Sequence, residues 1–253
     1  MFYFLEKLVL NIRNFGLIFT TIKVIKYPFT YLYRIKFDNK IKSISSTEER
    51  FNLIYRSNHW NNLESISGNG STYVYTEKLR SELPNLFSDF NIKNILDAPC
   101  GDFNWMKEVI RSVDINYTGG DIVKPLVMRL NKKYKDSKTS FIHIDLIKDK
   151  IPRTDLMICR DCLFHLSIKD IDKVIDNFIE SKTTYLLTTT HVNNNNFKNK
   201  DIVTGSFRHI DLYSAPFNFP HDPIMKIDDW LPPDNPRQMC LWSRDQIIST
   251  RQF

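Results

Sequence analysis

The stretch Asn94-Ile-Leu-Asp-Ala-Pro-Cys-Gly-Asp-Phe-Asn-Trp105 decides the fold that this sequence predicts. Ile92, Ile95 and Leu96 indicate a short buried strand that stops at Asp97. The chain then turns through Pro-Cys-Gly towards a helix. A strand, a turn of small residues and a helix N-terminus form the place where α/β folds bind nucleotide-like ligands. The carboxylate of Asp97 can accept hydrogen bonds from hydroxyl or ammonium groups of such a ligand.

Two further strands continue this pattern. Residues 117–122 predict a second strand that ends at Asp121, which follows Asp97 by 24 residues (121 − 97). An acidic residue about 20 residues beyond the first turn suits the binding of ribose hydroxyls. Residues 140–146 alternate in polarity and predict a third strand that carries Asp145. The turn after the first strand is not Gly-x-Gly-x-x-Gly, so a nicotinamide enzyme is not expected.

With these residues the chain resembles the class I S-adenosylmethionine-dependent methyltransferases. More narrowly, it resembles bacterial members that carry Asp-Ala-Pro-Cys-Gly-Asp-Phe-x-Trp as their first motif and are associated with capsule and surface-polysaccharide biosynthesis. The resemblance runs from about Trp60 to the C-terminus. It implies a doubly wound, Rossmann-like α/β fold with a mostly parallel seven-stranded sheet, helices on both faces and an N-terminal helical extension. We expect the extension at residues 1–50 and the methyltransferase domain at 51–253, with a substrate-loop insertion near 192–235.

The resemblance also implies S-adenosyl-L-methionine as the cofactor. It assigns to cofactor binding the first motif, the ends of the second and third strands, and a residue after the fourth: Asp97, Ala98, Pro99, Cys100, Gly101, Trp105, Asp121, Ile122, Asp145, Leu146 and Arg160. A Ser-Gly-x-Gly-Ser loop precedes the first motif and adds Gly68, Gly70, Ser71 and Thr72. The alternative for this loop is an ordinary turn before a helix at about residues 73–83.

Candidate catalytic residues follow the next two strands. Asp161 and His165 lie beyond a buried strand at 156–158, and His191 follows a β-branched strand at 183–190. A carboxylate and an imidazole at this edge of the sheet can act as general base and orienting group. Equally, Asp161 can bond loop backbone, His165 can pack against the cofactor, and His191 can be a simple loop histidine.

Residues 201–223 match Gly-x-x-Arg and Ala-Pro-Phe elements of the family. By that resemblance Arg208 is a candidate to bind a phosphate or carboxylate of the acceptor, and His209 is a further substrate residue. The alternative is a surface insertion with Arg208 in a salt bridge. Residues 238–243 predict the last strand, followed by a polar tail. The sixth strand has no clear pattern, so we expect the C-terminal third to depart from the family's layout.

The amino-acid composition limits the kinds of binding partner that we expect. With 253 residues of which 42% are hydrophobic, the chain can form one domain with an appended segment. The formal net charge of +6 suits acidic partners such as phosphorylated substrates, but also follows from an AT-rich genome. The basic residues form no tract, so nucleic acid is not an expected partner. Four cysteines are too few for a disulfide scaffold, and Cys159-x-x-Cys162 lacks a second pair, so no metal is expected.

Residues 1–36 are aromatic, apolar and dotted with basic residues, without a run long enough to span a bilayer. We expect a helical extension packed on the domain or on a partner subunit. An interfacial helix in contact with lipid is the alternative. We therefore expect a cytoplasmic protein, with peripheral contact to the inner membrane and homo-oligomerisation left open.

The resulting functional hypothesis is O-methylation of a bacterial capsule or surface-polysaccharide sugar, or of its phosphoramidate decoration. A small-molecule or glycan acceptor, with or without phosphate, fits it. The alternatives are methylation of nucleic acid or of another small molecule, and a non-catalytic scaffold that keeps the cofactor fold.

Overall fold

The computed structural model describes residues 32–33, 35–193 and 196–251. The chain divides into two compact units, Met1–Ser45 and Ser46–Phe253. In the first unit residues 35–43 are helical, and the predicted membrane or partner contact of residues 1–36 lies outside the described residues except at 32–33 and 35–36. Within the described part of the chain, no helix has both the length and the apolar character needed to cross a membrane.

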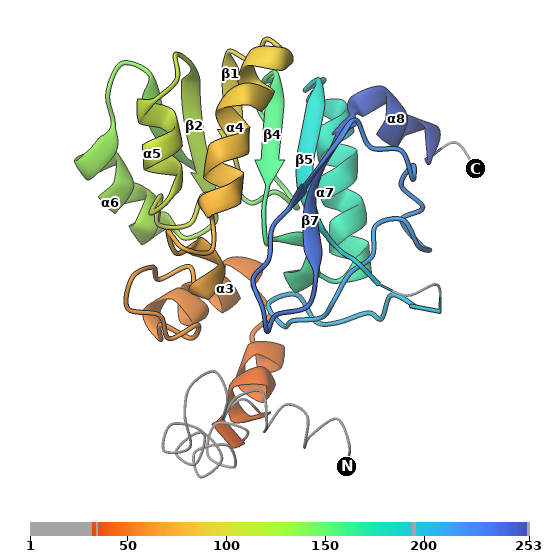
Figure 1. The fold of residues 1–253 in the computed structure, drawn as a ribbon. Coiled ribbons are helices and arrows are strands. Elements are labelled where there is room, and N and C mark those ends of the chain that lie inside the picture. The colour runs from red at the N-terminus through yellow and green to blue at the C-terminus, as the bar shows by residue number, and fades with distance from the viewer. Residues whose placement is uncertain (1–31, 34, 194–195, 252–253) are drawn as a thin grey trace. The chain divides into compact units, whose positions relative to one another are not determined.

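The second unit is built on a seven-stranded sheet in the order β3-β2-β1-β4-β5-β7-β6 (Figure 1). Strands β1 to β5 pair in parallel, and β7 runs antiparallel to both β5 and β6. The order turns outward in both directions from β1, which confirms the doubly wound, mostly parallel sheet. The strands are β1 Asn94–Asp97, β2 Asn116–Asp121, β3 Thr139–His143, β4 Leu156–Cys159, β5 Tyr185–His191, β6 Met225–Asp228 and β7 Arg237–Ser243.

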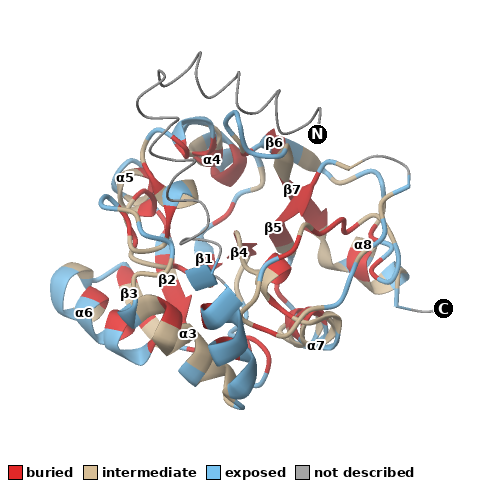
Figure 2. Cartoon of the chain, turned by 90° about the horizontal axis from the view of Figure 1, so that it is seen from below, coloured by how far each residue is buried: buried red, intermediate tan, exposed pale blue. Residues whose placement is uncertain are grey.

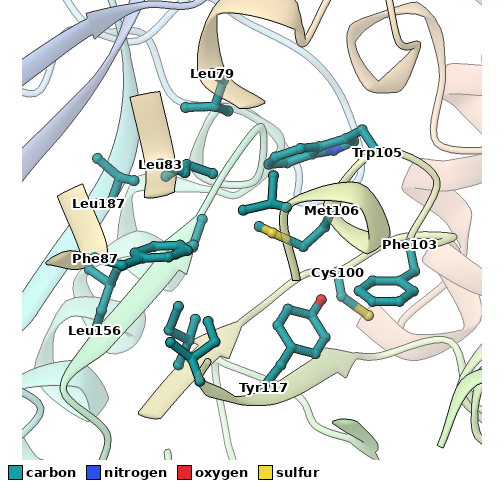
Figure 3. Close-up of a cluster of buried hydrophobic side chains, with 14 of the residues drawn as sticks. Leu79, Leu83, Phe87, Cys100, Phe103, Trp105, Met106, Tyr117, Leu156 and Leu187 are labelled. Atoms are coloured by element: carbon teal, nitrogen blue, oxygen red, sulfur yellow. The ribbon is translucent and has the colours of Figure 1, made fainter. Parts of the chain in front are cut away.

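Helices cover both faces of the sheet. The buried side chains of α4, α5 and α6 form one hydrophobic cluster with one face, and those of α7 and α8 form a second cluster with the other. Figure 3 shows part of the first cluster, with Leu79, Leu83 and Phe87 of α4 beside Leu156 and Leu187 of the sheet. The helices are α3 Thr47–Arg56, α4 Glu77–Asp89, α5 Met106–Arg111, α6 Lys124–Tyr134, α7 Ile168–Glu180 and α8 Arg244–Ser249, with 3-10 turns η1 Asn69–Ser71 and η2 Leu163–His165.

Alternate residues of the central strands belong to opposite clusters. In β4, Leu156 and Ile158 join the first cluster, whereas Met157 and Cys159 join the second. All four are buried, which explains why the sequence of this strand is apolar without alternation. Figure 2 shows how burial is distributed, with buried residues along β5 and β7 and exposed ones on the outer sides of the helices.

Helix starts follow the local sequence signals. Ser46 caps α3, since its Oγ accepts a hydrogen bond from the Glu49 amide at 3.3 Å, and Glu48 and Glu49 lie in the first turn. The helix before β1 is α4, and it begins at Glu77 and extends past Pro84 to Asp89, later than the predicted 73–83. Proline removes one backbone hydrogen bond there. Burial of the apolar side of α4 outweighs that loss.

The C-terminal third corrects two expectations. The sixth strand exists as β6 within the predicted insertion, so the order of the sheet is not rearranged. Its pattern escaped prediction because only Ile227 is buried in it. The chain after β7 is not a polar tail but helix α8, which Ser243 and Gln246 start with a reciprocal capping box. The described residues between β5 and β6, 192–193 and 196–224, contain neither helix nor strand.

Two glycines let β2 and β3 approach closely. A Cβ on Gly119 would lie 2.6 Å from the Phe141 ring, and one on Gly120 would lie 2.7 Å from Cγ2 of Ile144. Phe141 belongs to the first cluster, so side chains of β3 occupy the space that β2 leaves.

We expect Gly119→Ala to lower the free energy of unfolding by about 1–3 kcal/mol, because the added methyl group overpacks the core against Phe141. Urea denaturation measures this directly. The control Ser140→Ala changes a partly buried position of β3 and should stay within about 0.5 kcal/mol of the unchanged protein. Equal stability of Gly119→Ala and the unchanged protein would contradict the close packing.

Candidate cofactor and acceptor site

A cavity of about 390 Å³ lies where the parallel strands end. Its walls come from the loop 66–71, the turn after β1, the ends of β2 and β3, the segment after β4 and helix α3. Because parallel strands end at the same edge of a sheet, side chains far apart in the sequence meet there. This volume lies in the usual range of about 300–1,000 Å³ for small-molecule sites.

Three carboxylates from three adjacent strands line this cavity. Asp97 ends β1, Asp121 ends β2, and Asp145 follows β3. All three are buried, with 3%, 6% and 7% of their surface exposed respectively. Buried carboxylates need donors, and the cavity offers room for a ligand that supplies them.

Asp97 is held beside a tyrosine. It accepts a hydrogen bond from the Tyr117 hydroxyl at 2.7 Å. Burial raises the pKa of Asp97 to about 7, although the Tyr117 hydrogen bond and the charge of Arg160 act in the opposite direction. The carboxyl therefore titrates near neutrality, and a cationic ligand group beside it would favour its ionised form.

Asp121 is fixed by backbone amides. One carboxylate oxygen accepts from the Gly101 amide at 3.2 Å and the other from the Val123 amide at 2.9 Å. Burial raises the pKa of Asp121 to about 6, against the effect of these two amides. Both oxygens keep a second lone pair, so the carboxylate can still accept two hydroxyl groups.

Asp145 shares its end of the cavity with apolar side chains. Its Oδ1 accepts from the Ile147 amide at 3.0 Å, and its Oδ2 lies 3.3 Å from Nζ of Lys148. Ile122, Ile144 and Leu146 also line the cavity. A carboxylate beside aliphatic groups suits a flat heteroaromatic ring that carries an amino group.

The loop before β1 packs directly on the turn after it. Gly101 has φ +55°, and a Cβ there would collide with Oγ of Ser67. The Ser67 hydroxyl in turn accepts from the Asp102 amide at 3.1 Å. The carboxylate of Asp102 accepts from the Ser65 hydroxyl at 2.9 Å and from the Ile66 amide at 3.0 Å. Asp102 therefore anchors the loop over the turn.

Arg160 connects three distant segments. Its Nε and Nη2 form a paired contact with the carboxylate of Asp229, at 2.8 and 2.9 Å. Nη2 also donates to the carbonyl of Gly70 at 2.8 Å. The guanidinium lies 5.5 Å from the centre of the Trp105 ring. The segment after β4 is thereby tied to the Gly68–Ser71 loop and to the chain between β6 and β7.

Asp161 is held by a second arginine. Nη2 of Arg237 donates to its Oδ2 at 2.9 Å, and the Thr189 hydroxyl donates to its Oδ1 at 3.3 Å. Although burial opposes it, the charges of Arg160 and Arg237 hold the pKa of Asp161 below its usual range. An ionised carboxylate with two arginines is a weak proton acceptor, so it orients groups better than it removes protons.

His165 has one free ring nitrogen. Its Nδ1 lies 2.8 Å from the carbonyl oxygen of Ser206, which can only accept, so Nδ1 carries the proton. The structure gives Nε2 no partner among the described residues, and the ring lines the cavity. Burial holds the pKa of His165 below its usual value, so the imidazole is neutral at pH 7. Trp60, Phe164 and Phe207 surround it, at ring distances of 6.0, 4.6 and 5.8 Å.

The predicted cofactor residues converge on this cavity. All of them line it except Thr72, whose hydroxyl donates to the carbonyl of Asn69 at 2.9 Å and so closes the loop. The candidate catalytic residues Asp161 and His165 line it as well. His191, Arg208 and His209 do not. Within the described part of the chain, no cluster of His, Cys, Asp and Glu is arranged to hold a metal ion.

The position of His191 does not suit the predicted role of a general base, because the side chain is buried outside the cavity. It ends β5 but is only 5% exposed, and its Nδ1 accepts from the Ile210 amide at 3.2 Å. The neutral ring therefore carries its proton on Nε2 and has no free lone pair. Burial and the neighbouring His209 lower the pKa of His191 to about 4. The hydrogen bond between the His191 ring and the Ile210 amide holds residue 210 against the end of β5.

Arg208 forms no salt bridge within the described residues, and its Nη1 donates to the Phe164 carbonyl at 3.2 Å. His209 lies beside Asn235, with ring nitrogens 3.0 and 3.2 Å from the amide nitrogen. Neither side chain reaches the cavity wall, so the structure gives no support to their prediction as substrate residues.

Several residues of the site were not predicted from the sequence. Asp102 lies within the first motif, but no role was predicted for it, because its partners are 35 to 37 residues away. Asp229 directly follows β6, which was not predicted, and Arg237 is the first residue of β7, one residue before the predicted start of that strand. Phe51 and Tyr55 of α3 line the cavity, and only their helix was expected.

No family model and no curated protein matches this sequence. Solved structures match in fold. The methyltransferase domain of bacterial CtHen1 has 14% identity and a TM-score of 0.50, covering 67% of this chain and 99% of that chain. PigF with SAH has 13% identity and a TM-score of 0.51, covering 67% and 55%. Human N-acetylserotonin methyltransferase in complex with SAM has 15% identity and a TM-score of 0.49, covering 66% and 50%.

The chain has the class I methyltransferase fold. It spans about half the length of PigF and of the human enzyme, at 55% and 50%. At identities of 13–15% the likeness concerns the fold alone.

We expect Asp102→Ala to release the Ser65–Ser71 loop, because the carboxylate that accepts from Ser65 and Ile66 is removed. Amide hydrogen exchange of residues 65–71 should accelerate by about tenfold, as for the loss of about 1.4 kcal/mol of local stability. Exchange of β1 and β4 should stay unchanged. The control Asp114→Ala removes an exposed carboxylate paired with Lys138. Unchanged exchange of the loop in Asp102→Ala would exclude this anchor.

Proposed function

We propose that this chain transfers a methyl group from S-adenosyl-L-methionine to a hydroxyl oxygen of an acceptor. The observation that carries this proposal is the convergence of Asp97, Asp121 and Asp145 on one cavity that also holds the free Nε2 of His165. The fold and the likeness to PigF with SAH support the same cofactor.

The residues of the cavity fit the parts of this cofactor. Asp121 has two oxygens for the ribose hydroxyls, and Asp145 with Ile122 and Leu146 suits the adenine ring. Asp97, whose pKa of about 7 responds to a nearby cation, suits the ammonium of the methionine part. Gly101 permits close approach to the backbone, because it has φ +55° and no side chain. When bound, the cofactor supplies an activated methyl group on a sulfonium.

The protein must align the acceptor, exclude water and remove a proton from its hydroxyl. His165 is the base that fits, because it is neutral, faces the cavity and has Nε2 free. Asp161 orients the acceptor as a hydrogen-bond acceptor, held by Arg237 at 2.9 Å. Trp60 and Phe207 are partly exposed beside His165, and they shield the reacting atoms from water.

We further propose that the acceptor is a sugar hydroxyl of a bacterial capsule or surface polysaccharide, or its phosphoramidate decoration. The support is the first motif, Asp97 to Trp105, which resembles that of enzymes from this setting. The aromatic side chains beside His165 agree with a ring-shaped acceptor.

Cofactor binding is tested by calorimetric titration with S-adenosylmethionine and S-adenosylhomocysteine. We expect micromolar binding, and a loss of about tenfold to a hundredfold in affinity for Asp121→Asn, since hydrogen bonds to a charged group contribute about 1.5–3 kcal/mol. Asp114→Asn, on the surface, should bind as the unchanged protein does. If the folded, unchanged protein binds neither compound, the chain is a scaffold and the proposal fails.

The base is tested with sugar acceptors. The protein is incubated with S-adenosylmethionine and a panel of capsular oligosaccharides and nucleotide sugars, and formation of S-adenosylhomocysteine is followed. With an accepted sugar, His165→Gln should reduce turnover by about 10²–10⁴-fold while leaving cofactor affinity unchanged. His191→Gln should retain most of the turnover of the unchanged protein. Full turnover of His165→Gln would remove His165 as the base.

A further inference from the structure

The segment Thr204–Arg208 wraps around the 3-10 turn η2, which carries His165. The Gly205 amide donates to the His165 carbonyl at 2.7 Å, and the Ser206 carbonyl accepts from Nδ1 of the same residue at 2.8 Å. The Thr204 hydroxyl accepts from the Ser167 amide at 2.9 Å and donates to Asp170 at 2.6 Å. The turn and the start of α7 are thus held by a segment about 40 residues further along the chain.

Arg208 is the charged member of this segment. Its amide and its Nη1 both donate to the Phe164 carbonyl at 3.2 Å, and Nη1 also lies 3.5 Å from the Leu163 carbonyl. These carbonyls belong to the turn itself. The Leu163 carbonyl also accepts from the Leu166 amide at 3.1 Å, which closes the turn, whereas the Phe164 carbonyl is bonded by the amide and the side chain of Arg208. The guanidinium is thus a further donor to both carbonyls and holds the backbone that carries the imidazole.

Burial of this arginine demands an explanation. Its side chain is 8% exposed, its Nε and Nη2 have no hydrogen-bond partner within the described residues, and no carboxylate lies within salt-bridge distance there. The charge of Asp201 acts on this guanidinium only from beyond salt-bridge distance, and a buried guanidinium without a paired carboxylate costs stability. Substitution by a neutral side chain would relieve that cost, so the position is better explained by the site than by the stability of the fold.

We propose that Arg208 is a positioning residue, which fixes the Leu163–His165 turn so that the free Nε2 of His165 faces the cavity. The inference rests on the proposed function, in which His165 removes the proton from the acceptor. It replaces the prediction that Arg208 binds the acceptor, because the guanidinium is directed at backbone carbonyls instead.

The charge of Arg208 adds a second effect. Arg208 and His59 favour the neutral form of the His165 ring, whereas Asp161 and the Ser206 carbonyl favour the protonated form. Burial, the largest cause, lowers the pKa of His165 further. Removal of the Arg208 charge therefore raises the pKa of His165, and a lysine at this position retains the charge but not the paired contacts.

Histidine NMR tests the proposal without an acceptor. In ¹⁵N-labelled protein, with the signals of His165 assigned through His165→Gln, we expect the Nδ1–H tautomer in about tenfold excess over the other. In Arg208→Gln this excess should fall and the titration midpoint of His165 should move to higher pH. In Arg208→Lys the excess should also fall, but the midpoint should move less. The control Arg111→Gln, on an exposed part of α5, should change neither.

Three outcomes of these experiments would overturn the proposed role of Arg208. An unchanged tautomer and midpoint in Arg208→Gln would overturn the proposal even if its melting temperature fell, since a merely structural arginine has that effect. A proton on Nε2 in the unchanged protein would overturn it as well. If both variants failed to fold, Arg208 would be needed for the fold and the proposal would be wrong.

Calorimetry of the same variants with S-adenosylmethionine separates this test from the proposed function. Because Arg208 does not line the cavity, cofactor affinity should be retained.

Discussion

The paired contact between Arg160 and Asp229 is the interaction on which the site depends. Both side chains are buried, and ions removed from water need close partners. Asp229 meets the guanidinium through two parallel hydrogen bonds, the strongest geometry for such a pair. Arg237 and Asp161 extend it into a ring of four alternating charges, of which Arg160, Asp161 and Arg237 line the cavity. Because Arg160 also binds the Gly70 carbonyl, this ring sets the position of the loop above the sheet.

The three cavity carboxylates could be predicted, because strands and helices alternate regularly in this part of the chain. Asp97, Asp121 and Asp145 each follow a buried strand, and the β–α–β spacing brings strand ends to one edge. Asp229 could not be predicted in the same way. It lies 69 residues from Arg160, and strand β6 before it buries only Ile227, too little for a recognisable pattern. The bounds of α4 were also predicted wrongly, since the helix begins at Glu77 and continues past Pro84 to Asp89.

The two histidines show a different limit of sequence reasoning. Both follow strands of the sheet, and nothing in their neighbourhood in the sequence separates them. The structure separates them by the partner of Nδ1, which is a carbonyl for His165 and an amide for His191. A carbonyl demands a proton on Nδ1, whereas an amide demands a lone pair there. Whether Nε2 carries a lone pair or the proton thus depends on one backbone group, the Ser206 carbonyl for His165 and the Ile210 amide for His191.

The irregular chain between β5 and β6 has a consequence for how such a protein can change. The cofactor side is made by successive strands and helices, where an insertion would displace the sheet. The segment around Arg208 reaches His165 from a connection without helix or strand in its described residues. Loops of this kind tolerate changes of length and sequence far better than strands do. Changes in this connection can therefore alter the surroundings of His165 while the strands and helices of the sheet stay intact.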